Sequence, residues 1–146
     1  MDMDYIKIEF PSLSANESFA RAAVAAFASR LDPNMEELGD IKTAVSEAVT
    51  NCIVHAYPDC IGTITLRARI RQPDNELEIV VRDRGVGIAD VSKALEPMFT
   101  TGGEERSGMG FTIMESFMSD VRVRSAPGRG TTVTMLRRLA KRLPSR

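Results

Sequence analysis

The sequence has no tryptophan, and aromatic residues make up only 5% of its 146 residues. It therefore lacks the aromatic platforms on which many proteins stack single-stranded nucleic acid. Neither sign of charge dominates, because 19 lysines and arginines stand against 20 aspartates and glutamates, for a formal net charge of −1. We expect no global attraction to DNA or to an anionic membrane, and any charged patch must be local.

Cysteine and histidine are also scarce. Cys52 and Cys60 are eight residues apart, lack CxxC spacing and have a single histidine as a possible co-ligand, which argues against a disulfide framework or a zinc site. Free thiols indicate a reducing compartment. The acidic start does not resemble a signal peptide, and no apolar run approaches the roughly 18 residues of a membrane helix. We predict a cytoplasmic protein that contacts no membrane and binds no DNA directly.

Hydrophobic residues (43%) and charged residues (27%) are in the proportions of an ordinary compact domain. We predict one domain over residues 1–137, followed by a basic tail over residues 138–146. Alternating apolar residues predict strands over 5–10, 63–70, 77–81, 120–126 and 131–136. These strands, with the helices below, indicate an α+β fold in which helices pack on one face of an antiparallel or mixed sheet.

Helical periodicity covers residues 14–31, 35–56 and 110–119, and a short helix is expected over 90–95. The first helix has an apolar stripe that we predict to consist of Phe19, Ala22, Ala23, Ala26 and Phe27. The second helix carries the strongest helical pattern in the chain. Residues 137–146 contain five basic residues and predict a solvated segment.

Three polar residues lie on one stripe of the second helix. Glu47, Asn51 and His55 follow one another at intervals of four residues, and 3.6 residues per turn place them together beside the apolar face. An acid, an amide and an imidazole at such a position can border a cleft. The alternative is a solvated helix flank.

A second cluster follows the strand at 77–81, in the run Asp83-Arg84-Gly85-Val86-Gly87-Ile88. A carboxylate at a strand end can accept a hydrogen bond from an amino group, and two glycines let backbone approach a flat ligand. The alternative is a glycine-rich exit turn. The run is not a dinucleotide-binding fingerprint, because the glycines do not open a helix with the required spacing.

A third cluster, Arg106-Ser107-Gly108-Met109-Gly110-Phe111, opens the helix over 110–119. Free backbone N–H groups at a helix start, approached through glycines, can bind an anion. Residues 98–106 ahead of it are interpreted as a flap. The alternative is a plain glycine-rich connection, and the absence of a lysine after Gly110 excludes a P-loop.

The order of these clusters resembles the GHKL family of ATP-binding domains, which includes gyrase B, MutL, heat-shock chaperones and histidine kinases. The resemblance covers about residues 5–137. Within the family, Ser46-Glu47-Ala48-Val49-Thr50-Asn51, Phe99-Thr100-Thr101 and the run Arg106 to Glu115 look most similar to anti-sigma factors of spore-forming bacteria that are serine-protein kinases. The sporulation branch, which acts on sigma-F, matches best, and the general-stress branch acting on sigma-B is the alternative.

The resemblance implies a GHKL sandwich that binds ATP and Mg²⁺. Glu47 matches the general base and Asn51 matches the residue that binds Mg²⁺ beside the triphosphate. Asp83 matches the residue that reads the adenine amino group, and Gly85 and Gly87 shape that pocket.

Further matches concern the phosphates. Gly108, Met109 and Gly110 match the phosphate loop, and Thr131 matches a hydroxyl that supports a water network on the adenine side. We add Arg106 as a residue within reach of a phosphate or a partner, with an exposed flap charge as the alternative.

The implied partners are a second copy of the chain, a sigma factor held inactive in the ATP state, and an anti-anti-sigma protein phosphorylated on serine. Glu17 and Arg21, four residues apart, can belong to the partner surface or form a solvated pair. His55 is expected at a polar helix edge, because it lies on the ATP-site helix itself. The alternatives to a kinase are a nucleotide-gated sigma-binding module and a stand-alone ATPase.

Overall fold

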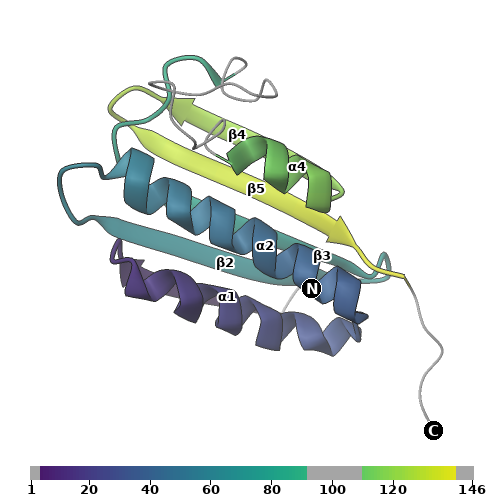
Figure 1. The fold of residues 1–146 in the computed structure, drawn as a ribbon. Coiled ribbons are helices and arrows are strands. Elements are labelled where there is room, and N and C mark those ends of the chain that lie inside the picture. Colours follow the sequence, from purple (N-terminus) through teal and green to yellow (C-terminus); the bar gives the residue numbers. More distant parts are fainter. Residues whose placement is uncertain (1–3, 92–109, 141–146) are drawn as a thin grey trace, which may run out of the picture.

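The computed structural model describes residues 4–91 and 110–140 of the chain. In these residues five strands form one antiparallel sheet in the order β1-β2-β3-β5-β4. The strands are β1 (Tyr5–Pro11), β2 (Thr63–Arg71), β3 (Glu76–Asp83), β4 (Asp120–Ala126) and β5 (Gly130–Arg138). Helices α1 (Ala15–Ala28), α2 (Met35–Asn51) and α4 (Phe111–Phe117) lie on one face of the sheet (Figure 1). This arrangement confirms the predicted α+β fold.

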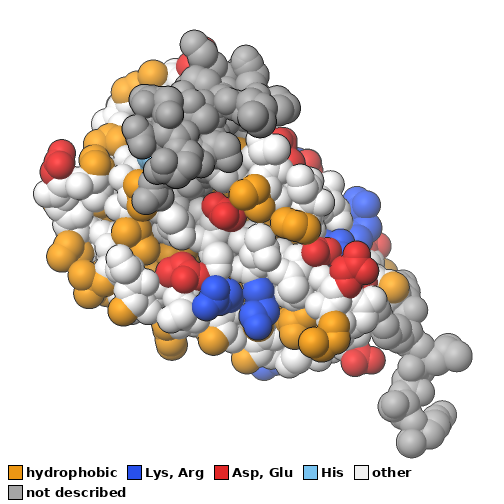
Figure 2. Space-filling view, viewed as in Figure 1, with side chains coloured by type: hydrophobic (Ala, Val, Ile, Leu, Met, Phe, Trp, Pro, Cys, Tyr) orange, Lys and Arg blue, Asp and Glu red, His pale blue; other side chains and the backbone are white. Residues whose placement is uncertain are grey.

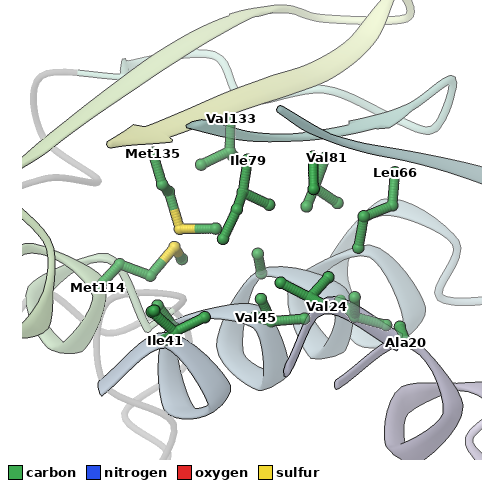
Figure 3. Close-up of a cluster of buried hydrophobic side chains, with 14 of the residues drawn as sticks. Ala20, Val24, Ile41, Val45, Leu66, Ile79, Val81, Met114, Val133 and Met135 are labelled. Carbon is green, nitrogen blue, oxygen red and sulfur yellow. The ribbon is translucent and has the colours of Figure 1, made fainter. Parts of the chain in front are cut away.

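The hydrophobic core lies between the sheet and the helices (Figure 3). Leu66 stands opposite Val81, and Ile79 stands opposite Met135, and each of these side chains is at most 1% exposed. Val45 of α2 is fully buried beneath them. Burial of this apolar surface is the main force that holds the helices on the sheet.

The predicted apolar stripe of α1 is wrong except for Phe27. Phe19 is 54% exposed, and the buried residues of the helix are Ala20, Val24, Phe27 and Ala28. These four follow the 0, 4, 7, 8 spacing of a helix face that packs on a core. The helix is rich in alanine on every side, so its composition is compatible with more than one stripe, and packing against α2 selects one of them.

Helix α2 begins at a capping box. The Glu37 N–H donates to Asn34 Oδ1 at 2.7 Å, and the Asn34 N–H donates to Glu37 Oε1 at 2.9 Å. The helix was expected to run to residue 56, but its α-helical part ends at Asn51 and continues as a π-helical turn, η2 (Cys52–Ala56). Such wide turns are frequent at functional sites, and this one begins directly after Asn51 and contains His55, the last residue of the polar stripe.

The end of the last strand and the residues that follow it pack more closely than expected. Arg137 forms an ion pair with Asp40 of α2 at 2.9 Å, and Leu139 is only 5% exposed. The Ala140 N–H donates to Glu37 Oε2 at 3.2 Å. The packed part of the chain thus extends to residue 140. No helix in the described part is both long and apolar enough to cross a membrane.

Candidate functional site

The carboxylate of Asp83 lies at the end of β3, where it is 5% exposed. Its Oδ1 accepts the backbone N–H groups of Gly85 at 2.9 Å and of Thr131 at 3.1 Å. Its Oδ2 accepts the thiol of Cys52 at 3.4 Å. A buried charge is tolerated when several donors compensate it, and these three donors also fix the direction in which the carboxylate points.

Cys52 and Tyr57 hold the surroundings of this carboxylate. Burial, followed by the nearby charge of Asp83, raises the pKa of the Cys52 thiol well above its ordinary value, so the sulfur stays protonated and can donate. The Tyr57 hydroxyl accepts the Arg84 N–H at 2.7 Å and donates to the carbonyl of Thr63 at 2.8 Å. Burial also raises the pKa of Tyr57. The sequence analysis assigned neither residue to the site, because their partners are distant in the chain.

Asp83 faces a small cavity to which several predicted residues contribute. The lining consists of Asn51, His55, Ala56, Asp83, Gly87, Ile88, Phe111 and Thr131. Its volume is about 30 Å³, which has room for about two water molecules. Pockets that hold small ligands have volumes of about 300–1,000 Å³, so this cavity must widen before a nucleotide can enter.

The two glycines after Asp83 are required by the chain's own packing. A Cβ on Gly85 would lie 2.2 Å from the carbonyl oxygen of Ala56, and one on Gly87 would lie 2.0 Å from that of Ala126. Gly87 also has a φ of +77°, which side chains disfavour. The sequence analysis attributed both glycines to the approach of a ligand, and the structure provides a second reason in the contacts with η2 and β4. Gly87 lines the cavity, while Gly85 packs behind it against η2.

Thr131 lines the cavity beside Asp83, and a second hydroxyl supports it. Thr131 Oγ1 lies 2.7 Å from Ser125 Oγ, which donates to the carbonyl of Gly130 at 2.9 Å and accepts the Ile88 N–H at 2.8 Å. Thr131 is 9% exposed. Ser125 was missed in the sequence, because only the register of β4 on β5 places it opposite Thr131.

Asn51, at the end of α2, lines the cavity and carries an unsatisfied polar group. Its Nδ2 is buried and has no hydrogen-bond partner within the described residues. Leaving such a donor unpaired costs about 1–3 kcal/mol, so a polar ligand atom is expected there. The oxygen and nitrogen of an amide exchange places on a flip, so the same side chain can offer a donor to a phosphate or an oxygen to a cation.

The residues described here contain no group of three or more histidines, cysteines or carboxylates that could hold a metal ion alone. Mg²⁺ typically binds one or two protein oxygens and completes its shell with water and substrate phosphates. The single amide of Asn51 fits that pattern.

Glu47 lies one helical turn before Asn51. Burial raises the pKa of its carboxyl, and the charge of Glu17 raises it further. Gly110, which caps α4 with a φ of +77°, lies against it, since a Cβ there would be 2.5 Å from Glu47 Oε2. The start of α4 thus abuts the carboxylate. The other residues predicted for the phosphate end, Arg106, Gly108 and Met109, lie outside the described residues.

Glu17 and Arg21 form the expected pair, with 3.4 Å between Arg21 NH1 and Glu17 Oε2. The pair is joined to α2 by Ser46, whose hydroxyl donates to Glu17 Oε2 and accepts from Arg21 NH1 at 3.4 Å. Ser46 immediately precedes Glu47. The charges of α1 therefore lie beside the candidate base.

Comparison with known proteins places this fold in a defined class. Residues 10–137 match the family model described as "Histidine kinase-like ATPase domain". Among solved structures, the RsbU and RsbW domains of Rv1364c from Mycobacterium tuberculosis share the fold with a TM-score of 0.67 and 21% identity, covering 97% of this chain and 34% of that chain. The cavity beside Asp83 is thus the candidate nucleotide site of a kinase-like ATPase domain.

The curated relatives are more specific. An "Anti-sigma F factor" of Caldanaerobacter subterraneus subsp. tengcongensis is 57% identical over 137 residues, covering 93% of this chain and 94% of the relative. The protein of the same name from Bacillus subtilis is 51% identical over 136 residues, with 92% of each chain covered. The chain belongs to the anti-sigma F factor family.

Proposed function

We propose that this chain is an anti-sigma factor and protein-serine kinase. In this proposal it binds Mg²⁺-ATP beside Asp83, holds a sigma factor inactive in the ATP state, and transfers the γ-phosphate to a serine of an anti-anti-sigma protein. The observation that carries the proposal is the convergence of Asp83, Asn51 and Thr131, from three separate elements, on one cavity. Family membership supports the choice of a sigma factor, and the names of the relatives favour sigma-F over the sigma-B alternative.

At the adenine end, Asp83 accepts a hydrogen bond from the exocyclic amino group. Its carboxylate already binds three donors, so its orientation is set before ligand arrives. A guanine would present a carbonyl oxygen to the same carboxylate, and two acceptors facing each other exclude that base. Thr131 supports the adenine side through its contact with Ser125.

At the phosphate end, Asn51 supplies the amide that the cavity leaves unsatisfied. Mg²⁺, when bound, neutralises charge on the phosphate oxygens. Gly110 abuts Glu47 and joins Gly108 and Met109 in the proposed phosphate loop, and we assign Arg106 to a phosphate or to a partner.

Glu47 acts as the base that accepts the serine proton. Burial and the nearby charge of Glu17 raise its pKa, which makes it a better proton acceptor than an ordinary glutamate. Positioning therefore contributes more than basicity, as is general for phosphoryl transfer. An intact base favours transfer over the alternative of a sigma-binding module that only responds to nucleotide.

The partners are proposed on the same basis. The chain acts as a homodimer in the cytoplasm, and Glu17 and Arg21 on α1 contribute to the surface that meets its protein partners. Their contacts with Ser46, the residue before Glu47, support this assignment.

Substitution Glu47→Gln tests the assignment. We expect ATP affinity to stay within about twofold, because the amide keeps the shape of the side chain, while transfer falls by about 10²–10⁴ because the base is lost. Native mass spectrometry with Mg²⁺-ATP, before and after addition of a purified anti-anti-sigma protein, reports bound nucleotide, dimer mass and phosphate gain together. Glu36→Gln, at an exposed position in the first turn of the same helix, is the control.

Each outcome has a distinct meaning. Loss of ATP binding in Glu47→Gln would contradict the role of Glu47 as a base. A wild-type chain that binds ATP but transfers no phosphate would favour the gated binding module. A wild-type chain that binds no ATP would refute the proposal as a whole.

A further inference from the structure

The face of the sheet opposite the helices carries an unusual concentration of positive charge. No helix covers this outer face in the part of the chain that the structure describes. Residues that stand directly opposite one another across the five strands form rows, and two adjacent rows point outward. They consist of Lys7, Arg67, Val80, Thr134 and Arg122, and of Glu9, Thr65, Arg82, Thr132 and Arg124.

These two basic rows hold five cations and a single acid, Glu9, although the whole chain has a net charge of −1. The helix-covered face is different, since acidic, basic and hydrophobic side chains are interspersed there (Figure 2). The charge of the chain is therefore distributed unequally between the two faces of the molecule.

Most of these cations have no acidic partner. Lys7, Arg67, Arg82 and Arg124 form no ion pair with any residue that the structure describes. Lys7 stands directly opposite Arg67, an arrangement that destabilises a sheet. The next outward-facing row contains Arg69 and Glu78, which stand opposite each other. Their charges compensate each other in an ion pair of 2.7 Å.

The outer face is also hollowed at the basic rows. A groove of about 470 Å³ is lined by Glu9, Tyr57, Gly62, Thr63, Thr65, Arg82 and Arg84. Its two guanidinium groups and the Thr63 hydroxyl are hydrogen-bond donors. The Thr65 hydroxyl already donates to Glu9 at 3.2 Å. A second hollow of about 190 Å³ includes Arg67.

We propose that the basic rows are a docking surface for an acidic protein segment that carries several aspartates or glutamates. Guanidinium groups bind carboxylates through two parallel hydrogen bonds, and four of the five cations are arginines. A single-stranded nucleic acid is less favoured, because the chain has no tryptophan and few aromatic residues on which bases could stack. Arg82 and Asp83 are adjacent in β3 and point to opposite faces, so this surface is separate from the nucleotide cavity.

The test is a titration of the ¹⁵N-labelled chain with hexaglutamate, in which NMR spectra record the chemical shifts of the backbone amides. We expect shifts confined to amides of the basic rows, and about tenfold weaker binding in Arg67→Glu/Arg82→Glu, since two attractive pairs become repulsive. Arg67→Gln/Arg82→Gln removes the charges without introducing acids and guards against a folding defect. Arg30→Glu/Lys42→Glu changes the net charge equally on exposed residues of the helical layer and should bind like wild type.

Several results would overturn the proposal. Equal weakening in both charge-reversed variants would indicate a response to net charge alone. Tighter binding of oligothymidylate than of hexaglutamate at equal ionic strength would identify a nucleic-acid surface. A change of mass by light scattering between wild type and Arg67→Gln/Arg82→Gln would show that the face meets a second copy of the chain. ATP affinity, measured on the same samples, tests the proposed kinase function independently.

Discussion

The two ends of the candidate site are built in different ways. At the proposed adenine end, Asp83 is held mainly by backbone N–H groups, which the sheet and its exit turn place. At the proposed catalytic end, Glu47 projects from a helix, and the charge of Glu17 on another helix contributes to its raised pKa. Substitution of surrounding side chains should therefore change the function of Asp83 little, because backbone groups hold it. The same kind of substitution should change the function of Glu47 more. The following substitutions test that contrast.

The largest effect is expected from Asp83→Asn. In asparagine, an NH₂ group replaces one of the two carboxylate oxygens. This donor would face other donors, namely those that now bind the carboxylate or the amino group of adenine. Hydrogen bonds to a charged group contribute about 1.5–3 kcal/mol, so ATP affinity should fall by about 10–100-fold in isothermal calorimetry. Asp120→Asn, at a partly exposed site on β4, should bind ATP like wild type. Unchanged affinity in Asp83→Asn would show that the adenine end lies elsewhere.

A smaller effect is expected from Gly110→Ala. Its φ of +77° costs about 1–2 kcal/mol for a residue with a Cβ, and that Cβ would lie 2.5 Å from Glu47 Oε2. Displacement of the base should slow transfer by about tenfold or more and leave ATP affinity less affected. Gly128→Ala has nearly the same φ, +75°, with nothing near the new Cβ. If both variants slow transfer equally, the contact with Glu47 is irrelevant.

Glu17→Gln should shift the pH dependence of transfer. Removing this charge lowers the pKa of Glu47, so the base remains ionised in more acidic buffer and the acid limb of the rate profile moves to lower pH. The raised pKa of Glu47 also means that its neutral form favours the folded state, a contribution that is lost as pH rises through that pKa. An acid limb that coincides with that of wild type would contradict the coupling.

The smallest effect is expected from Cys52→Ala. The thiol is a weak donor, and the two backbone donors of Asp83 remain, so ATP affinity should change by no more than about threefold. Cys60→Ala, at an exposed site, provides the control. A loss as large as that in Asp83→Asn would mean that a side chain, rather than the backbone, sets the adenine end.

Local sequence patterns were sufficient to predict the secondary structure of a large part of the molecule. The alternation in β2 and β3 and the periodicity of α2 follow from adjacent residues, and the structure confirms them. The interval of four residues likewise places Glu47 and Asn51 on one side of α2. Such features depend on the geometry of a single element, which the sequence specifies directly.

Only the tertiary structure determined the features that depend on contacts between different elements of the fold. The buried face of α1 was selected by packing against α2, since alanine on every side leaves the pattern ambiguous. Cys52 and Ser125 joined the site through contacts across 31 and 6 residues, set by the π-helical turn and by the β4–β5 register. The basic rows also exist only because five strands align, since positive charges spread along the chain become neighbours only when the register of the sheet brings them together.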